Sequence, residues 1–243
     1  MTIATEEAGF DFPELPLKSA PDGVSILLTG ADSEALERVF YHLITAREDE
    51  RSLVLAPETS GQVVNRALDS VVAGASTRST VLTCEEPAGE SSIDALGESP
   101  ALSSVGMQFS ALVTESGTVA APQRAGLLVG ADICRRVSDK QSISRFVQAN
   151  FLAHLRRSRI MGVCGIDTSD PRAGERTAIA AEMAAAFSVH LRVERGDGKT
   201  ISIQITGPDR TDETVSVDLP AVVPPAEASP EPESRTPRVE VGD

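Results

Sequence analysis

Lysine, aromatic residues and long apolar runs are all scarce in this sequence. Its 243 residues include three lysines, no tryptophan and only 3% aromatic residues, and the formal net charge at pH 7 is −14. A surface this acidic disfavours nucleic acid and anionic membranes, which attract basic proteins. No stretch approaches the roughly 18 consecutive apolar residues of a membrane span, and the N-terminus lacks a signal-peptide pattern. We therefore expect a soluble, cytoplasmic protein with no membrane partner and no nucleic-acid partner.

Cysteine and histidine are equally sparse, with three of each. The cysteines, Cys84, Cys134 and Cys164, are odd in number and far apart, which excludes a disulfide framework and the spacing of a metal site. We expect them to be reduced and mostly buried. The histidines are isolated, on predicted helix or strand surfaces, so neither a metal-ligand set nor a catalytic triad is predicted. They are His42, His154 and His190.

The acidic composition has two interpretations. Abundant Asp and Glu with very little lysine is typical of a cytoplasmic protein adapted to concentrated salt, where screening shortens charge repulsion to a few ångströms. An ordinary acidic protein would carry the same sign of charge. The scarcity of lysine favours the first, halophilic interpretation.

The length and apolar content fit one domain with tails. With 41% hydrophobic residues, the chain can build one large core but is short for two. Residues 1–11 are polar and acidic, so we expect a disordered N-terminus. Residues 221–243 are rich in Pro and Glu and have too little apolar surface to offset the entropy of ordering them, which predicts a disordered acidic tail. The folded domain is thus expected at 12–220.

Within this domain, short apolar segments alternate with segments whose apolar residues recur at helical spacing. Such alternation predicts an α/β fold, with a mostly parallel central sheet and helices on both faces. After about residue 189 the apolar period changes from 3.6 to 2, which predicts a C-terminal antiparallel meander. Strands are predicted at 24–29, 52–56, 79–84, 125–132, 160–166, 189–193, 201–205 and 215–219. Helices are predicted at 34–44 with Ser33 as the cap, and at 63–71, 105–113, 142–157 and 171–187.

The stretch 25–38 has the outline of a phosphate-binding loop without its chemistry. A working loop of this type runs Gly, four residues, Gly, Lys and then Ser or Thr. The backbone wraps the phosphates, the ammonium neutralises them and the hydroxyl holds magnesium. Counted from Gly30, the last three places are Ala35, Leu36 and Glu37. We therefore interpret the stretch as a degenerate loop.

Acidic residues at the same helix start also oppose a polyphosphate. Asp32, Glu34 and Glu37 place carboxylates where the helix dipole would otherwise favour an anionic ligand. A like-charge contact near 4 Å costs on the order of 1 kcal/mol in water and about 4 kcal/mol at an effective dielectric near 20. Because the lysine is missing as well, the affinity for a nucleotide should fall by orders of magnitude.

The element order and several motifs resemble the RecA/KaiC-like P-loop ATPases, and more closely the divergent KaiC-like proteins of salt-loving archaea. The likeness covers about residues 12–206. The segments 15–18 (Leu-Pro-Leu-Lys) and 23–30 (Gly-Val-Ser-Ile-Leu-Leu-Thr-Gly) are similar to the family's lead into its phosphate loop. The resemblance implies a RecA-like three-layer sandwich.

The resemblance also implies roles for two carboxylates. Glu58 stands where KaiC-type enzymes carry the second of two paired catalytic glutamates, and Pro57 replaces the first. Asp132 ends the apolar strand 127–132 and matches the magnesium-associated aspartate of the family. Because the loop lacks its Lys and Ser/Thr, we interpret both carboxylates as vestigial, and no catalytic or metal site is predicted.

Three hypotheses for function follow. The first is a non-catalytic RecA/KaiC-like domain, a pseudo-ATPase that uses no cofactor and acts on an unknown protein partner as a regulatory or interaction module. The second is an ATPase with an atypical loop, which would use ATP and magnesium through Asp132 and Glu58. The third is a receiver-like domain, although the paired acids after the first strand and the late lysine are missing. Since RecA-like domains often form rings or filaments, a homo-oligomer is an open possibility.

Overall fold

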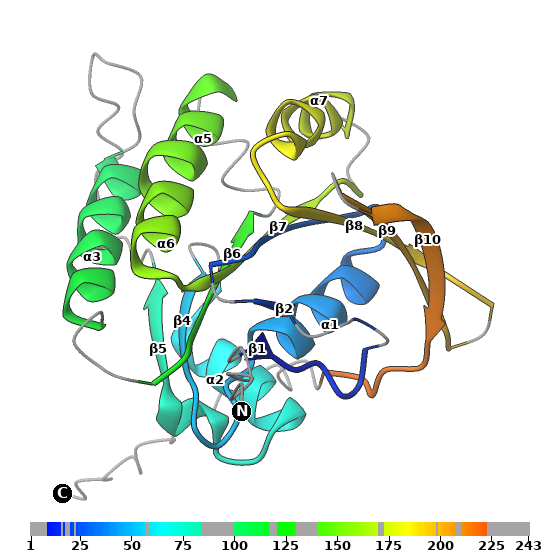
Figure 1. The fold of residues 1–243 in the computed structure, drawn as a ribbon, viewed down its shortest axis with the longest axis horizontal. Coiled ribbons are helices and arrows are strands. Elements are labelled where there is room, and N and C mark those ends of the chain that lie inside the picture. The colour runs from blue at the N-terminus through cyan, green and yellow to red at the C-terminus, as the bar shows by residue number, and fades with distance from the viewer. Residues whose placement is uncertain are drawn as a thin grey trace, which may run out of the picture.

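The computed structural model describes residues 9–222 apart from 16, 18–19, 22, 57–58, 84–99, 117–120, 130–139, 170–172, 198 and 208–209. Its centre is an eight-stranded sheet with the strand order β10-β9-β8-β3-β7-β6-β4-β5 (Figure 1). A two-stranded sheet, β1-β2, lies beside it. The strands of the two sheets are β1 Gly9–Phe10, β2 Ala20–Pro21, β3 Ser25–Gly30, β4 Arg51–Ala56, β5 Ser79–Thr83, β6 Gln123–Val129, β7 Met161–Asp167, β8 Val189–Arg195, β9 Ile201–Gly207 and β10 Arg210–Val217.

Strands β5, β4, β6, β7, β3 and β8 pair in parallel, and β9 and β10 then pair antiparallel. The predicted α/β class with a mostly parallel, mixed sheet is therefore confirmed. The register aligns Gly30 at the end of β3 with Asp167 at the end of β7. Loops that follow these two strands consequently leave the sheet at the same edge.

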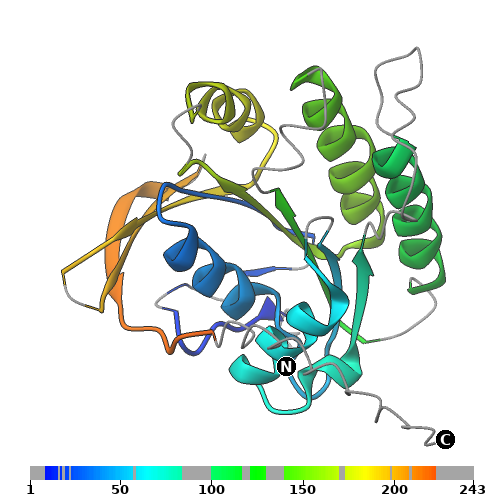
Figure 2. The same cartoon turned by 180° about the vertical axis from the view of Figure 1, so that it is seen from behind.

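Helices cover both faces of the sheet (Figures 1 and 2). Helices α1 and α2 lie on one face, and the remaining helices lie on the other. Each face has its own cluster of buried apolar side chains. The helices are α1 Ser33–Ile44, α2 Gly61–Val71, α3 Pro100–Ser116, α5 Lys140–Phe146, α6 Ala153–Ser158 and α7 Ala173–Ala184, with a 3₁₀ turn Ala75–Arg78 and a π-helical turn Val147–Leu152.

Small residues in β6 and β7 let α1 approach the sheet closely. A Cβ added at Gly126 would lie 2.7 Å from Ile44 Cγ2 and 2.9 Å from Phe40 Cζ. A Cβ at Gly165 would lie 3.3 Å from the ring of Phe40. The two glycines therefore create the space that the side chains of Phe40 and Ile44 on α1 fill.

The N-terminal segment packs on the sheet through a buried arginine. Gly9 and Phe10 pair with β2, so ordered structure begins before residue 12. The Arg124 side chain is 0% exposed, and its guanidinium lies 5.2 Å from the ring centroids of both Phe10 and Phe12. The N-terminal segment thus covers part of the core on the face of the sheet that carries α1.

Several element boundaries differ from the prediction. The helix expected at 142–157 contains a π-helical turn between α5 and α6, and α7 ends at Ala184 before the buried Phe187. Strand β10 begins at Arg210 because its pairing with β9 extends beyond the alternating apolar residues. The predicted tail, apart from its first two residues, lies outside the described residues. No helix in the described part of the chain is long and apolar enough to cross a membrane.

Candidate functional site

The loop that the sequence predicts to be a degenerate phosphate-binding loop connects β3 to α1 at the carboxyl edge of the sheet. Gly30 is tightly packed there, since a Cβ at this position would lie 2.9 Å from the carbonyl oxygen of Val193 on β8 and 3.3 Å from Leu36 Cδ1. The close approach of the β3 and β8 backbones therefore explains why residue 30 is a glycine, and no bound phosphate is needed to explain it. Ala35 and Leu36 are buried against the sheet, so the position that would carry the phosphate-binding lysine lies in the core.

The amino end of α1 is capped by the protein's own carboxylate. Asp32, and not the predicted Ser33, is the N-cap, and its Oδ1 accepts a hydrogen bond from the Ala35 N–H at 2.9 Å. Its Oδ2 accepts a hydrogen bond from Arg195 Nε at the end of β8. The neighbouring guanidinium holds the pKa of Asp32 below its usual value. An anion is therefore already present at the helix end that a phosphate would occupy.

A second acidic side chain at this helix end is also paired. Glu34 forms ion pairs with Arg195 at 3.2 Å and with Arg38 one turn along α1. Arg195 and Arg38, the arginines described at this helix end, are consequently engaged with carboxylates of the protein.

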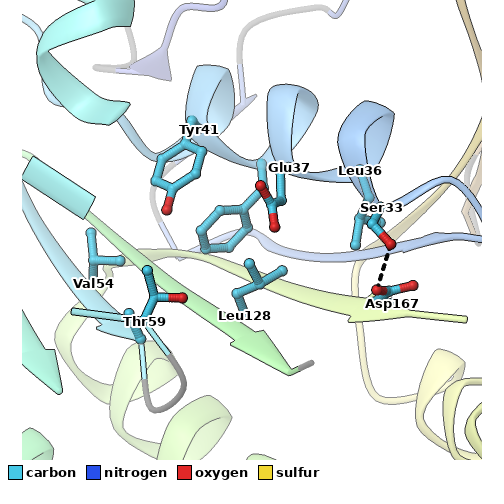
Figure 3. A pocket seen from close by; sticks show the side chains of 10 residues that line it. Ser33, Leu36, Glu37, Tyr41, Val54, Thr59, Leu128 and Asp167 are labelled. Atoms are coloured by element: carbon cyan, nitrogen blue, oxygen red, sulfur yellow. Dashed lines mark hydrogen bonds between the residues drawn. The ribbon is translucent and has the colours of Figure 1, made fainter. Parts of the chain in front are cut away.

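Ser33 has a different role from the one predicted. As the first residue of α1, it donates a hydrogen bond from Oγ to Asp167 Oδ2 at 2.8 Å (Figure 3). Asp167 also accepts the Ser169 N–H at 2.8 Å. These bonds connect the start of α1 to the end of β7. Asp167 was missed, although in the sequence it follows an apolar segment, which is the pattern that singled out Asp132, and that signal would have found it.

A pocket of about 130 Å³ lies between α1 and the carboxyl halves of β4, β6 and β7 (Figure 3). This volume is below the roughly 300–1,000 Å³ of sites for drug-sized ligands. Half of the lining side chains are polar and half are apolar, and none is basic. They are Ser33, Leu36, Glu37, Phe40, Tyr41, Val54, Ala56, Thr59, Leu128 and Asp167.

Electrostatics in the pocket favour positive rather than negative ligands. Glu37 is exposed at the rim, yet its pKa is raised, first by partial desolvation against the wall and then by the carboxylates of Asp167 and Glu34. Burial, with a further contribution from Glu37, raises the pKa of Tyr41 far above its ordinary value. When ionised, Glu37 is a negative charge at the position where a working phosphate-binding loop has its magnesium-binding hydroxyl.

The residues present do not fit ATP and magnesium. The backbone N–H of Ala35 is used by Asp32, Leu36 supplies no ammonium, and Glu37 supplies no hydroxyl. The described residues also contain no group of three or more His, Cys, Asp or Glu side chains able to hold a metal ion. Glu58 and Asp132 lie outside the described residues, although the strands that precede them, β4 and β6, are parallel neighbours.

The other reactive side chains in the described part of the chain do not join this site. Cys164 is buried in the sheet, which raises its pKa to about 12 and leaves an unreactive thiol. Cys84 and Cys134 lie outside the described residues. His154 and His190 are held by single hydrogen bonds, His154 Nε2 to the Ser110 hydroxyl and His190 Nε2 to the Thr29 hydroxyl, each at 2.8 Å.

His42 corrects the prediction of a surface histidine. It is 3% exposed, because the segment that contains Glu14 covers this face of α1. Its Nδ1 lies 3.9 Å from Glu14 Oε2, and burial lowers its pKa.

Searches of protein-family models and of curated proteins find no match to this chain. Function is therefore argued from the chain's own geometry.

Proposed function

We propose that this chain is a RecA/KaiC-like domain that has lost nucleotide binding and acts as a regulatory or protein-interaction module in a halophilic cytoplasm. The observation that carries the proposal is the cap of α1. The Asp32 carboxylate, held by Arg195, satisfies the helix N-terminus from within, so a phosphate would have to displace an ion-paired side chain. Neither Leu36 nor Glu37 could compensate for that cost, because they lack the ammonium and the hydroxyl.

The strand order supports the RecA/KaiC-like assignment over a receiver-like domain. Flavodoxin-like sheets, to which receiver domains belong, have the order 2-1-3-4-5, in which the first strand neighbours the second. In this chain β3, the first strand of the large sheet, lies between β7 and β8, and β6 and β7 separate it from β4. A different doubly wound binding module of the receiver type is thus disfavoured by topology as well as by its missing residues.

The order of the strands indicates that the carboxyl edge of the sheet, at the ends of β3 and β7, is the place where a ligand would bind. Helix α1 leaves β3 on one face of the sheet, and α7 leaves β7 on the other (Figures 1 and 2). Ligands of open α/β sheets bind where such connections diverge, outside the carboxyl ends of the strands. In this chain that position holds the Ser33–Asp167 hydrogen bond and the small acidic pocket. This edge is where a RecA-like ancestor would have bound a nucleotide, and the groups that bind phosphate are missing from the loop there.

The proposal is tested by calorimetric titration of Mg·ATP into the full chain in molar KCl, together with thermal melting under the same conditions. We expect no saturable heat and no nucleotide-dependent rise in Tm, since a ligand that binds only the native state must raise it. A saturable signal would overturn the proposal. In that event, hydrolysis by the wild type and by Asp132→Asn decides whether the chain is an ATPase, because an active enzyme must lose turnover in the variant.

A further inference from the structure

The pocket has an aromatic corner that no nucleotide chemistry explains. The rings of Phe40 and Tyr41 meet nearly at right angles, with an interplanar angle of 79° and centroids 5.5 Å apart. Both residues come from the face of α1 that lines the pocket. The faces of such rings carry negative charge and attract cations, most strongly where water is excluded.

Tyr41 and Glu37 present polar groups to the pocket that have no partner among the described residues. Tyr41 is only 5% exposed, its hydroxyl points into the pocket (Figure 3), and it makes no hydrogen bond within the described part of the chain. Because this hydroxyl opens into the pocket, it is available to accept a hydrogen bond from a ligand there. The Glu37 carboxylate, one turn before Tyr41, also lacks an ion pair with any described residue.

The described charged residues of the pocket all carry negative charge. Glu37 and Asp167 both line it, Glu34 lies near enough to influence Glu37, and none of the lining residues that the structure describes is Lys or Arg. An anion in the pocket would be repelled by the carboxylates and by the negative ring faces. A cation would be attracted by both.

We propose that this pocket binds a small organic cation, an alkylammonium or guanidinium head group that pairs with Glu37, contacts the Tyr41 hydroxyl and lies against the ring faces of Phe40 and Tyr41. The inference rests on the proposed function only in that no nucleotide fills the site. The head group can belong to a free amine or to a basic side chain of a protein partner.

The composition of the wall favours an organic cation over a metal ion. Calcium takes six to eight oxygen ligands, and magnesium requires near-octahedral oxygen coordination. Half of the lining residues here are apolar, including Leu36, Val54 and Leu128. The pocket volume of about 130 Å³ has room for an ammonium group with a short alkyl stem, whose methylenes would cover these apolar side chains.

The test is a titration of the full chain with n-propylammonium, followed by calorimetry and by NMR, with 1-propanol and propionate as neutral and anionic controls of similar size. We expect saturable binding of propylammonium alone. Glu37→Gln should weaken it at least tenfold and Tyr41→Phe about threefold to tenfold, because each removes one contact and keeps the side-chain volume. Glu213→Gln, on exposed β10, serves as the matched control and should bind as the wild type does.

Parallel titrations show whether the head group comes from a free amine or from a partner side chain, and whether other ligands bind more tightly. Nα-acetyl-lysine amide binding more tightly than propylammonium would identify a partner side chain as the occupant, and weaker binding would identify a free amine. Absence of propylammonium binding, equal binding of 1-propanol, unchanged affinity in both Glu37→Gln and Tyr41→Phe, or tighter binding of K⁺ or Mg²⁺ would each overturn the inference. The Mg·ATP titration is separate, so loss of the proposed function and loss of this inference give different results.

Discussion

Arg124 and Glu50 form a bidentate ion pair inside the protein. Arg124 Nε donates to Glu50 Oε2 and Nη2 donates to Oε1, both at 2.7 Å. The same guanidinium donates to the backbone carbonyls of Leu43 at the end of α1 and of Asp11 in the N-terminal segment. One buried side chain therefore connects β6, α1 and the start of the chain.

Arg124→Ala should lower the free energy of unfolding by about 3–5 kcal/mol, because it leaves the Glu50 carboxylate without its partner. Urea denaturation followed by circular dichroism measures the loss. Arg51→Ala is the matched control, since Arg51 is exposed at the start of β4, and it should change stability by less than about 0.5 kcal/mol. Similar stabilities for the two variants would contradict a structural role for the ion pair.

Asp32→Ala should cost about 1 kcal/mol at pH 7, since it removes the cap of α1. The pKa of folded Asp32 is lowered from 3.8, so its stabilisation is complete above that value and is lost as the pH falls through the lower folded pKa. Urea denaturation between pH 6 and pH 2 should show the wild type and the variant converging in acid.

Ser60→Ala provides a control for the Asp32 experiment. Ser60 is the N-cap of α2, but its side chain makes no capping hydrogen bond. We therefore expect a small, pH-independent effect. A difference between wild type and Asp32→Ala that stays constant down to pH 2 would contradict the assigned ion pair.

Glu37→Gln should have the opposite pH dependence. The pKa of folded Glu37 is raised from 4.5, so the folded state binds the proton more tightly than the unfolded state does. Ionised Glu37 thus destabilises the protein above its folded pKa, and this penalty disappears below pH 4.5. At pH 7 the variant should be as stable as the wild type or more stable, by up to about 0.5 kcal/mol, and thermal melts from pH 7 to pH 4 should remove any gain.

Gly30→Ala should destabilise the protein by about 1–3 kcal/mol, because the added methyl group would meet the Val193 carbonyl oxygen, which is backbone and cannot rotate away. Gly61→Ala at the start of α2 is the control, since its Cβ would meet only Thr83 Cγ2 at 3.9 Å. Chemical denaturation distinguishes the two variants. An unchanged stability for Gly30→Ala would show that this glycine is not required by packing.

Local sequence patterns predicted most of the secondary structure because the period of apolar residues depends on which face is buried. The strand–helix alternation up to α2 and the change of period after residue 189 illustrate this success. The π-helical turn at 147–152 was not predicted, since its apolar residues keep an ordinary helical spacing. The resemblance to RecA/KaiC-like ATPases stays a prediction.

The site was less predictable because its contacts join residues far apart in sequence. Asp32 and Ser33 are both suitable caps, and their roles depend on Arg195 and Asp167, each more than 130 residues away. No local pattern signals that an arginine will be buried, as Arg124 is. The absence of phosphate-binding residues from the loop was visible in the sequence, whereas the carboxylate that caps α1 from within the protein was not.

The position of β3 between β7 and β8 has a consequence for biosynthesis. This strand is synthesised early, but both of its neighbours are made from residues 161–195. The side chain that fixes the cap of α1 belongs to Arg195, the last residue of β8. During translation, β3 and α1 therefore lack their final neighbours until residues 161–195 have been made, so the pairing of β3 depends on contacts between distant parts of the sequence.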